Sequence, residues 1–171
     1  MQNNTEIAVS IVMGSDSDYP VMEEAVKILK IFSVPHEIFL TSAHRSPERT
    51  TDFARKAAGR NVKVIIVGAG AAAHLAGVIA SQTILPVIGV PIDSSVLKGM
   101  DALLSTVQMP GGIPVATMAI GKAGAKNAAL LAIRILSLTD GELHQRLVAY
   151  IDDMAHEIER KQEDLLRKNW S

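Results

Sequence analysis

The sequence predicts a single α/β domain built on a parallel β-sheet that helices cover on both faces. Short apolar segments, of the length of buried strands, alternate along the chain with longer amphipathic segments of helical period. Hydrophobic residues make up 48% of the 171 residues but aromatic residues only 4%, so the core is expected to consist of Val, Ile, Leu, Ala and Met. This composition is typical of parallel strands that are buried on both faces.

Five strands are predicted from apolar runs that end at turn-forming residues. These runs are Ile7–Met13, Ile38–Thr41, Val62–Val67, Val87–Val90 and Pro114–Ile120. Helices are expected at Pro20–Phe32, from Pro47 onward, and at about Ala72–Gln82, Met100–Val107 and Ala123–Leu136. Asp18 and Ser46 are candidate N-caps, each with a proline close behind it. Because right-handed crossovers leave few topologies, we favour the flavodoxin-like strand order.

The C-terminal segment predicts one long amphipathic helix over residues 140–168. It follows a core of about residues 7–138 within a single domain of residues 1–171. Its apolar face consists of Leu143, Leu147, Ile151, Met154 and Ile158. At 1.5 Å per residue the helix would span roughly 40 Å, longer than the core of a small domain, so we expect its far half to pack against another subunit. A solvated or frayed tail is the alternative.

Composition and charge exclude several classes of function. Seventeen basic residues balance eighteen acidic ones, which indicates neither nucleic-acid binding nor an anionic membrane surface. The absence of cysteine excludes disulfides, thiolate catalysis and cysteine-ligated zinc. Met1–Glu6 does not resemble a signal peptide, and no apolar run reaches the ~20 residues that span a bilayer. A cytoplasmic protein is therefore expected.

The first loop of interest is Gly14–Asp18, after the first strand. In an open parallel sheet, ligands bind beyond the carboxyl ends of the strands, where this loop lies. The Ser15 and Ser17 hydroxyls and the N–H groups at a helix N-terminus suit an anion, although a plain capped turn explains them equally well. The loop matches neither a Walker motif nor a dinucleotide fingerprint. Asp16 and Asp18 argue against a highly charged ligand such as a triphosphate.

The second loop, Ser42-Ala43-His44-Arg45, precedes a helix at the same edge. His44 is a candidate for accepting a proton near neutral pH, and the guanidinium fork of Arg45 suits a phosphate. A surface or structurally satisfied histidine is the alternative. The neighbouring arginine favours a site that binds a small phosphorylated metabolite and performs proton transfer.

The third loop runs from Gly68 through Gly70 and Ala71 to His74. Its six consecutive small residues allow backbone to approach a ligand closely and to present N–H groups to it. Such a loop could hold a carboxylate or a small neutral molecule such as carbon dioxide, or could simply pack a helix tightly on the sheet. His74 is either a second functional imidazole or a structural hydrogen-bonding group.

Taken together, the ordered motifs resemble one enzyme family over roughly residues 7–148. They are Val12–Asp18, Ser42–Arg45, Gly68–Gly70 with His74-Leu75, Gln108–Pro110 and Gly121–Gly124. The chain resembles the catalytic subunit of phosphoribosylaminoimidazole carboxylase, the N5-carboxyaminoimidazole ribonucleotide mutase family of purine biosynthesis. Each motif alone is weak, but the ordered set is specific.

This resemblance implies a reaction, an assembly and roles for individual residues. The family is flavodoxin-like and homo-octameric, uses no metal or organic cofactor, and works with an ATP-dependent N5-carboxyaminoimidazole ribonucleotide synthase. It moves a carboxyl group from the exocyclic nitrogen of the substrate to ring carbon C4, on the route to IMP. His44 is then the catalytic acid–base residue. The expected substrate-binding residues are Ser15, Ser17, Asp18, Ser42, Ala43, Arg45, Gly70, Ala71 and His74.

Two alternatives to the mutase reaction remain at this point. The related carboxylase class fixes free carbon dioxide directly onto aminoimidazole ribonucleotide, but its loop usually lacks the histidine that is present here as His74. The second alternative is a non-catalytic flavodoxin-like module, such as a signalling receiver or a flavin carrier. However, the chain lacks the phosphorylatable aspartate that a receiver has after the third strand, and it has few aromatic residues to stack on a flavin. The chain departs from the mutase pattern at Ala71, usually glycine, and at Ala76, usually proline. If residue 71 requires a positive φ, alanine there costs about 1 kcal/mol.

Overall fold

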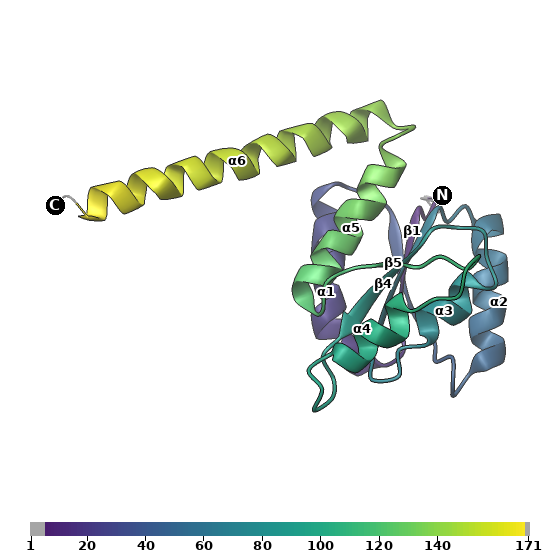
Figure 1. Ribbon diagram of the computed structural model, residues 1–171. Coiled ribbons are helices and arrows are strands. Elements are labelled where there is room, and N and C mark those ends of the chain that lie inside the picture. Colours follow the sequence, from purple (N-terminus) through teal and green to yellow (C-terminus); the bar gives the residue numbers. More distant parts are fainter. Residues whose placement is uncertain (1–5, 170–171) are drawn as a thin grey trace. The chain divides into compact units, whose positions relative to one another are not determined.

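Five parallel strands form the sheet, in the order β2-β1-β3-β4-β5 (Figure 1). The computed structural model describes residues 6–169, so most of the segment Met1–Glu6 lies outside the described residues. The strands are β1 (Val9–Met13), β2 (His36–Leu40), β3 (Val64–Gly70), β4 (Val87–Ile92) and β5 (Ala116–Thr117). This is the flavodoxin-like order that the alternation of strands and helices predicted.

Helices connect the strands and complete the chain. They are α1 (Tyr19–Ile31), α2 (Pro47–Ala57), α3 (Leu75–Ala80), α4 (Met100–Val107), α5 (Lys122–Leu136) and α6 (Gly141–Asn169), with the short 3-10 turns η1 (Asp16–Asp18) and η2 (Ala58–Arg60). The central strands are mostly apolar because helices bury both of their faces: every residue of β1 and β4 is buried, Ser10 being the one residue of these two strands with a polar side chain.

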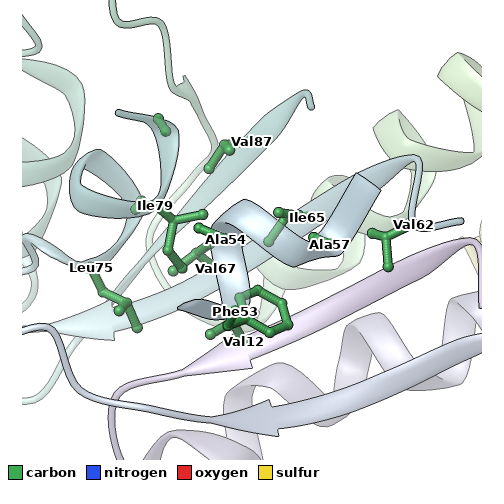
Figure 2. Packing of buried hydrophobic residues seen from close by; sticks show 12 residues of the cluster. Val12, Phe53, Ala54, Ala57, Val62, Ile65, Val67, Leu75, Ile79 and Val87 are labelled. Atoms are coloured by element: carbon green, nitrogen blue, oxygen red, sulfur yellow. The ribbon is translucent and has the colours of Figure 1, made fainter. Parts of the chain in front are cut away.

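Helices α2 and α3 pack on one face of the sheet and α1 on the other. Phe53 and Ala54 of α2 join Leu75 of α3 in a buried cluster with Val12 and Val67 of the central strands (Figure 2). On the opposite face, a Cβ on Gly68 would overlap the side chain of Met22 in α1. The absence of a side chain at position 68 therefore lets α1 lie close to β3.

Two elements are shorter than the sequence predicts. Strand β5 covers two residues, because beyond it only single hydrogen bonds continue the pairing, from Met118 N–H to the Gly89 carbonyl and from Gly121 N–H to the Pro91 carbonyl. Helix α3 begins at Leu75 rather than near residue 72. The residues before it form tight turns after Ala71, whose φ of 51° is incompatible with a helix.

The chain divides into two compact units after Ala132, inside α5. The second unit contains α6, which has the length that its period predicts. Of its apolar residues, Leu143 and Leu147 are buried, whereas Ile151, Met154 and Ile158 are exposed. The assignment of all 171 residues to a single domain stays a prediction. No helix among residues 6–169 combines the length and the apolar character that crossing a membrane requires.

Candidate functional site

A cavity of about 320 Å³ opens at the carboxyl edge of the sheet in the first unit. Its lining comes from all three loops that the sequence singled out, together with Ser94 after β4. The lining residues are Gly14, Ser15, Ser17, Asp18, Ser42, Ala43, His44, Arg45, Ala69, Gly70, Ala72, His74, Leu75 and Ser94. Of the predicted site residues, only Ala71 does not line this cavity.

The strand order explains why the loops meet. Met13 of β1 is in register with Leu40 of β2 and with Gly68 of β3, so these strands end at nearly the same level. The loop after β1 therefore lies between the loop after β2 and the loop after β3. Residues some 30 positions apart along the chain are neighbours at this edge.

The loop after β1 is organised around Ser15 and Asp18. Ser15 Oγ accepts hydrogen bonds from the Ser17 backbone N–H at 3.3 Å and from the Ser17 hydroxyl at 2.8 Å. The Asp18 carboxylate accepts the Ser15 backbone N–H at 3.1 Å. Asp18 lies at the N-cap position of α1, as predicted, but its side chain turns back to the loop and does not bond the helix; Ser15 caps the turn η1.

Asp18 is an acidic side chain buried without a directly bonded cation. It is 6% exposed. Burial raises its pKa above the ordinary value of 3.8, although the N–H groups of Ser15 and Gly14 lower it in part and Arg45 lowers it slightly. A carboxylate whose burial is only partly compensated, on a cavity wall, is suited to accept hydrogen bonds from ligand hydroxyls.

Arg45, in the loop after β2, reaches the loop after β1. Arg45 Nη2 donates to the Gly14 carbonyl at 2.9 Å, and the Arg45 backbone N–H donates to Ser42 Oγ at 3.2 Å. Ser46 does not cap α2 with its side chain, contrary to the prediction, because its hydroxyl bonds the backbone of Ser42. Pro47 does occupy the first turn of α2, as predicted.

His44 and His74 contact each other across the cavity. His44 Nε2 lies 2.8 Å from His74 Nδ1, and the two rings are nearly perpendicular with centroids 5.0 Å apart. A hydrogen bond between two imidazole nitrogens requires one proton between them, so one nitrogen donates and the other accepts.

The loop after β3 depends on a glycine at position 70 and on a strained backbone at Ala71. A Cβ on Gly70 would overlap Ser94 Oγ, so glycine at this position is what admits the Ser94 hydroxyl to the cavity. Ala71 adopts a φ of 51°, the conformation in which alanine is strained relative to glycine. Residue 71 therefore does adopt the positive φ that was considered from the sequence.

Ser94 is a lining residue that the sequence analysis missed. It follows β4, and within residues 6–169 the structure records no hydrogen bond for its hydroxyl. In the sequence, only the glycine at position 70 indicates that another residue packs closely here, and it does not show which one. The described part of the chain also contains no cluster of three or more His, Cys, Asp or Glu side chains able to hold a metal ion.

These features define an open α/β protein with a polar ligand cavity at the carboxyl edge of its sheet, the position where proteins of this architecture bind small molecules. A family model described as AIR carboxylase matches residues 8–157. The chain belongs to this family.

Named relatives agree with this assignment. The chain is 57% identical over 162 residues to the N5-carboxyaminoimidazole ribonucleotide mutase of Pyrococcus horikoshii, covering 95% of this chain and 90% of the relative. It is 56% identical over 144 residues to the mutase of Escherichia coli, covering 84% and 85%. Among solved structures, Treponema denticola PurE matches with a TM-score of 0.84 at 31% identity, covering 92% of this chain and 98% of that one.

Proposed function

We propose that this chain converts N5-carboxyaminoimidazole ribonucleotide to 4-carboxy-5-aminoimidazole ribonucleotide in purine biosynthesis. It is then an isomerase that moves a carboxyl group within one nucleotide. Relatives that are 51–58% identical over most of the chain carry the mutase name. The observation in the structure that supports the reaction best is the 2.8 Å contact between His44 and His74 inside the cavity.

Proton transfer falls to His44 in this proposal. Loss of carbon dioxide from the N-carboxylate leaves an electron-rich aminoimidazole, and the exocyclic nitrogen takes up a proton. Ring carbon C4 then attacks the retained carbon dioxide and releases its own proton. One imidazole that gives the first proton and accepts the second leaves the proton balance unchanged, and such positioned catalysis contributes about 10²–10⁴-fold. The hydrogen bond between His44 and His74 holds the ring of His44 in place for both steps.

Substrate binding is divided between the other two loops. Arg45 and Ser15 are suited to the phosphate, because a guanidinium fork and hydroxyl and N–H donors all favour an anion. The Asp18 carboxylate repels phosphate and suits the ribose hydroxyls instead. Ser17, Ser42 and Ala43 complete the wall on this side.

Carbon dioxide is retained, in this proposal, by the loop after β3. Gly70 and His74 line the cavity here, and Ala71, which does not line it, would act through the conformation that it gives the loop. Direct carboxylation of aminoimidazole ribonucleotide with free carbon dioxide is not favoured, since the relatives with more than half of their residues in common are named mutases.

The assembly, the partner and the compartment are part of the same proposal. We expect a cytoplasmic homo-octamer that receives its substrate from an ATP-dependent N5-carboxyaminoimidazole ribonucleotide synthase. The exposed apolar residues of α6, among them Ile158 at 64% exposure, support contacts with further subunits. Light scattering that shows a monomer would contradict the octamer.

Substrate discrimination tests the proposed reaction. The purified protein is expected to turn over N5-carboxyaminoimidazole ribonucleotide without ATP or added bicarbonate. A protein that instead required high bicarbonate, and that was indifferent to the N-carboxylated substrate, would be a direct carboxylase. No turnover with either substrate would refute both readings.

A further inference from the structure

Three hydroxyl side chains lie beneath the loop that carries His44 and Arg45. Thr41 directly follows β2, Ser46 directly precedes α2, and Thr50 lies in α2. Thr41 and Thr50 are 3% and 0% exposed, and their hydroxyl oxygens are 2.9 Å apart. Ser46 Oγ is 3.3 Å from the Thr41 hydroxyl. We call these three residues the hydroxyl chain.

The direction of each hydrogen bond follows from counting protons. The Thr50 hydroxyl donates to the Ser46 carbonyl at 3.1 Å. The Thr41 proton then goes to Thr50 Oγ1, which at 2.9 Å is nearer than Ser46 Oγ at 3.3 Å. The Ser46 hydroxyl donates to the Ser42 carbonyl at 3.1 Å. Each hydroxyl has one proton, so with Thr41 donating to Thr50 all three protons are used, and the 3.3 Å approach of Ser46 Oγ to the Thr41 hydroxyl is a packing contact with no proton in it.

The hydroxyl chain fastens the loop at its first residue. Ser46 Oγ accepts the Ser42 backbone N–H at 3.1 Å and donates to the Ser42 carbonyl, so one side chain holds both polar groups of that residue's backbone. Ser42 Oγ in turn accepts the backbone N–H of Arg45. His44 and Arg45 are themselves exposed, so burial does not fix their position. Their placement depends on the loop, and the loop depends on the hydroxyl chain.

We propose that Thr41, Ser46 and Thr50 are positioning residues that set where His44 and Arg45 stand in the cavity. None of the three is in contact with the substrate in this account; they act through the loop above them. The inference rests on the proposed function, because it assigns these residues to proton transfer by His44 and to phosphate binding by Arg45. A displacement of reacting groups by about 1 Å costs about 10²-fold in rate, so a small loosening of the loop is enough to be measured.

The test replaces the buried hydroxyl pair by an apolar pair of similar shape. Removing both partners at once leaves no unsatisfied hydroxyl, so the Thr41→Val/Thr50→Val variant is expected to fold with nearly unchanged thermal stability. Its kcat for N5-carboxyaminoimidazole ribonucleotide is expected to fall about 10- to 100-fold, with a rise in KM because Arg45 is also displaced. Thr50→Ser keeps the hydroxyl and is expected to retain the wild-type kcat.

Two further variants separate positioning from stability. Thr106→Val makes the same change at another buried threonine, whose hydroxyl donates to Ala102 within α4 and does not contact this loop. It is expected to alter thermal stability but neither kcat nor KM. Ser46→Ala removes the link to Ser42 at a half-buried position, so it carries the test if the double variant does not fold.

Wild-type kcat and KM in the variant lacking both threonine hydroxyls, or in Ser46→Ala, would overturn the inference. So would a Thr106→Val variant that lost as much rate, or a Thr50→Ser variant as slow as the Thr41→Val/Thr50→Val variant. The proposed function fails by a different result, namely no turnover by the wild-type protein. The two failures are therefore distinguishable.

Discussion

Glu37 in β2 and Asp18 beside the cavity are both acidic residues withdrawn from solvent, but they have opposite surroundings. Glu37 accepts two hydrogen bonds from Arg60, at 2.8 and 3.0 Å, and one from the buried Ser10 hydroxyl at 2.6 Å. Although burial alone would raise the pKa of Glu37, these partners outweigh it and lower the pKa. Burial of Asp18 is only partly offset, so the pKa of Asp18 is raised.

The difference separates a structural region from a functional one. Along the strands, polar groups are paired with one another and stabilise the fold. At the carboxyl edge, the burial of the Asp18 carboxylate is only partly compensated, the Ser94 hydroxyl lines the cavity without a hydrogen bond among the described residues, and Ala71 adopts a strained φ. Proteins commonly lose some stability at such sites. Each prediction below perturbs one of the two regions.

The largest effect is expected at His44. His44→Asn removes the proposed proton carrier, and kcat is expected to fall about 10²–10⁴-fold in a steady-state assay, with little change in thermal stability because the side chain is exposed. His144→Asn, at an exposed position of α6, is the matched control and is expected to keep the wild-type rate. An undiminished rate in His44→Asn would exclude the proposed role.

Gly70→Ala is expected to damage the cavity. The new Cβ overlaps Ser94, so either the loop or β4 must shift, and kcat/KM is expected to fall about tenfold or more. Gly59→Ala is the control, because a Cβ there meets no atom within 4 Å. Equal activity of the two variants would show that the fit between Gly70 and Ser94 does not matter.

Asp18→Asn is expected to weaken binding without weakening the fold. A group whose pKa is raised by folding opposes folding once it ionises, so the wild-type carboxylate costs stability at neutral pH. The variant is expected to match or exceed the wild-type Tm at pH 7, with an advantage that disappears as the pH falls below the ordinary Asp pKa of 3.8. KM is expected to rise about tenfold, the equivalent of one lost hydrogen bond to a charged group. A lower Tm at neutral pH would contradict this assignment.

Glu37→Gln is expected to do the reverse. A group whose pKa is lowered by folding stabilises the fold above its unfolded pKa, and this stabilisation is lost as the pH falls through the folded pKa. The variant is expected to lose about 1 kcal/mol at pH 7 in denaturant unfolding, with unchanged kcat, and to approach the wild type in acid. Glu23→Gln, which breaks an exposed ion pair with Lys27, serves as the control and should have no measurable effect.

The smallest effect is expected at Ala71. Glycine accepts a φ of 51° without strain, so Ala71→Gly is expected to raise the unfolding free energy by about 1 kcal/mol or less. Ala72→Gly, at the next residue, lacks that benefit and is expected to lower it. A loss of stability in Ala71→Gly would show that alanine is not strained there.

Most of the fold could be predicted from the sequence because buried strands and amphipathic helices leave periodic patterns. Strand β5 was overestimated, since the apolar run Pro114–Ile120 does not reveal where regular pairing stops. Ser46 lies at the N-cap position of α2, but the partner of its side chain was wrongly predicted because a serine before a helix can bond either the helix or the preceding loop. The choice depends on the distance to Ser42, which only the folded loop determines.

The candidate site was predictable to the level of its loops. Parallel strands deliver those loops to one edge, so Asp18, His44 and His74 could be grouped from sequence alone. The contact between the two imidazoles could not, because it depends on how far the loops after β2 and β3 extend towards each other past the loop after β1. Ser94 was missed because its contact with Gly70 is between residues at the ends of two neighbouring strands, and the sequence does not show which side chains meet there.

The hydrogen bond from Arg45 to the Gly14 carbonyl bears on the thermodynamics of ligand capture. A free arginine on a cavity rim samples many rotamers, and a ligand that selects one of them loses about 0.5–1.5 kcal/mol of affinity to that ordering. Here Nη2 is already anchored at 2.9 Å. The ordering of this side chain therefore occurs during folding. An anion that binds Arg45, as proposed, would not lose affinity to this ordering.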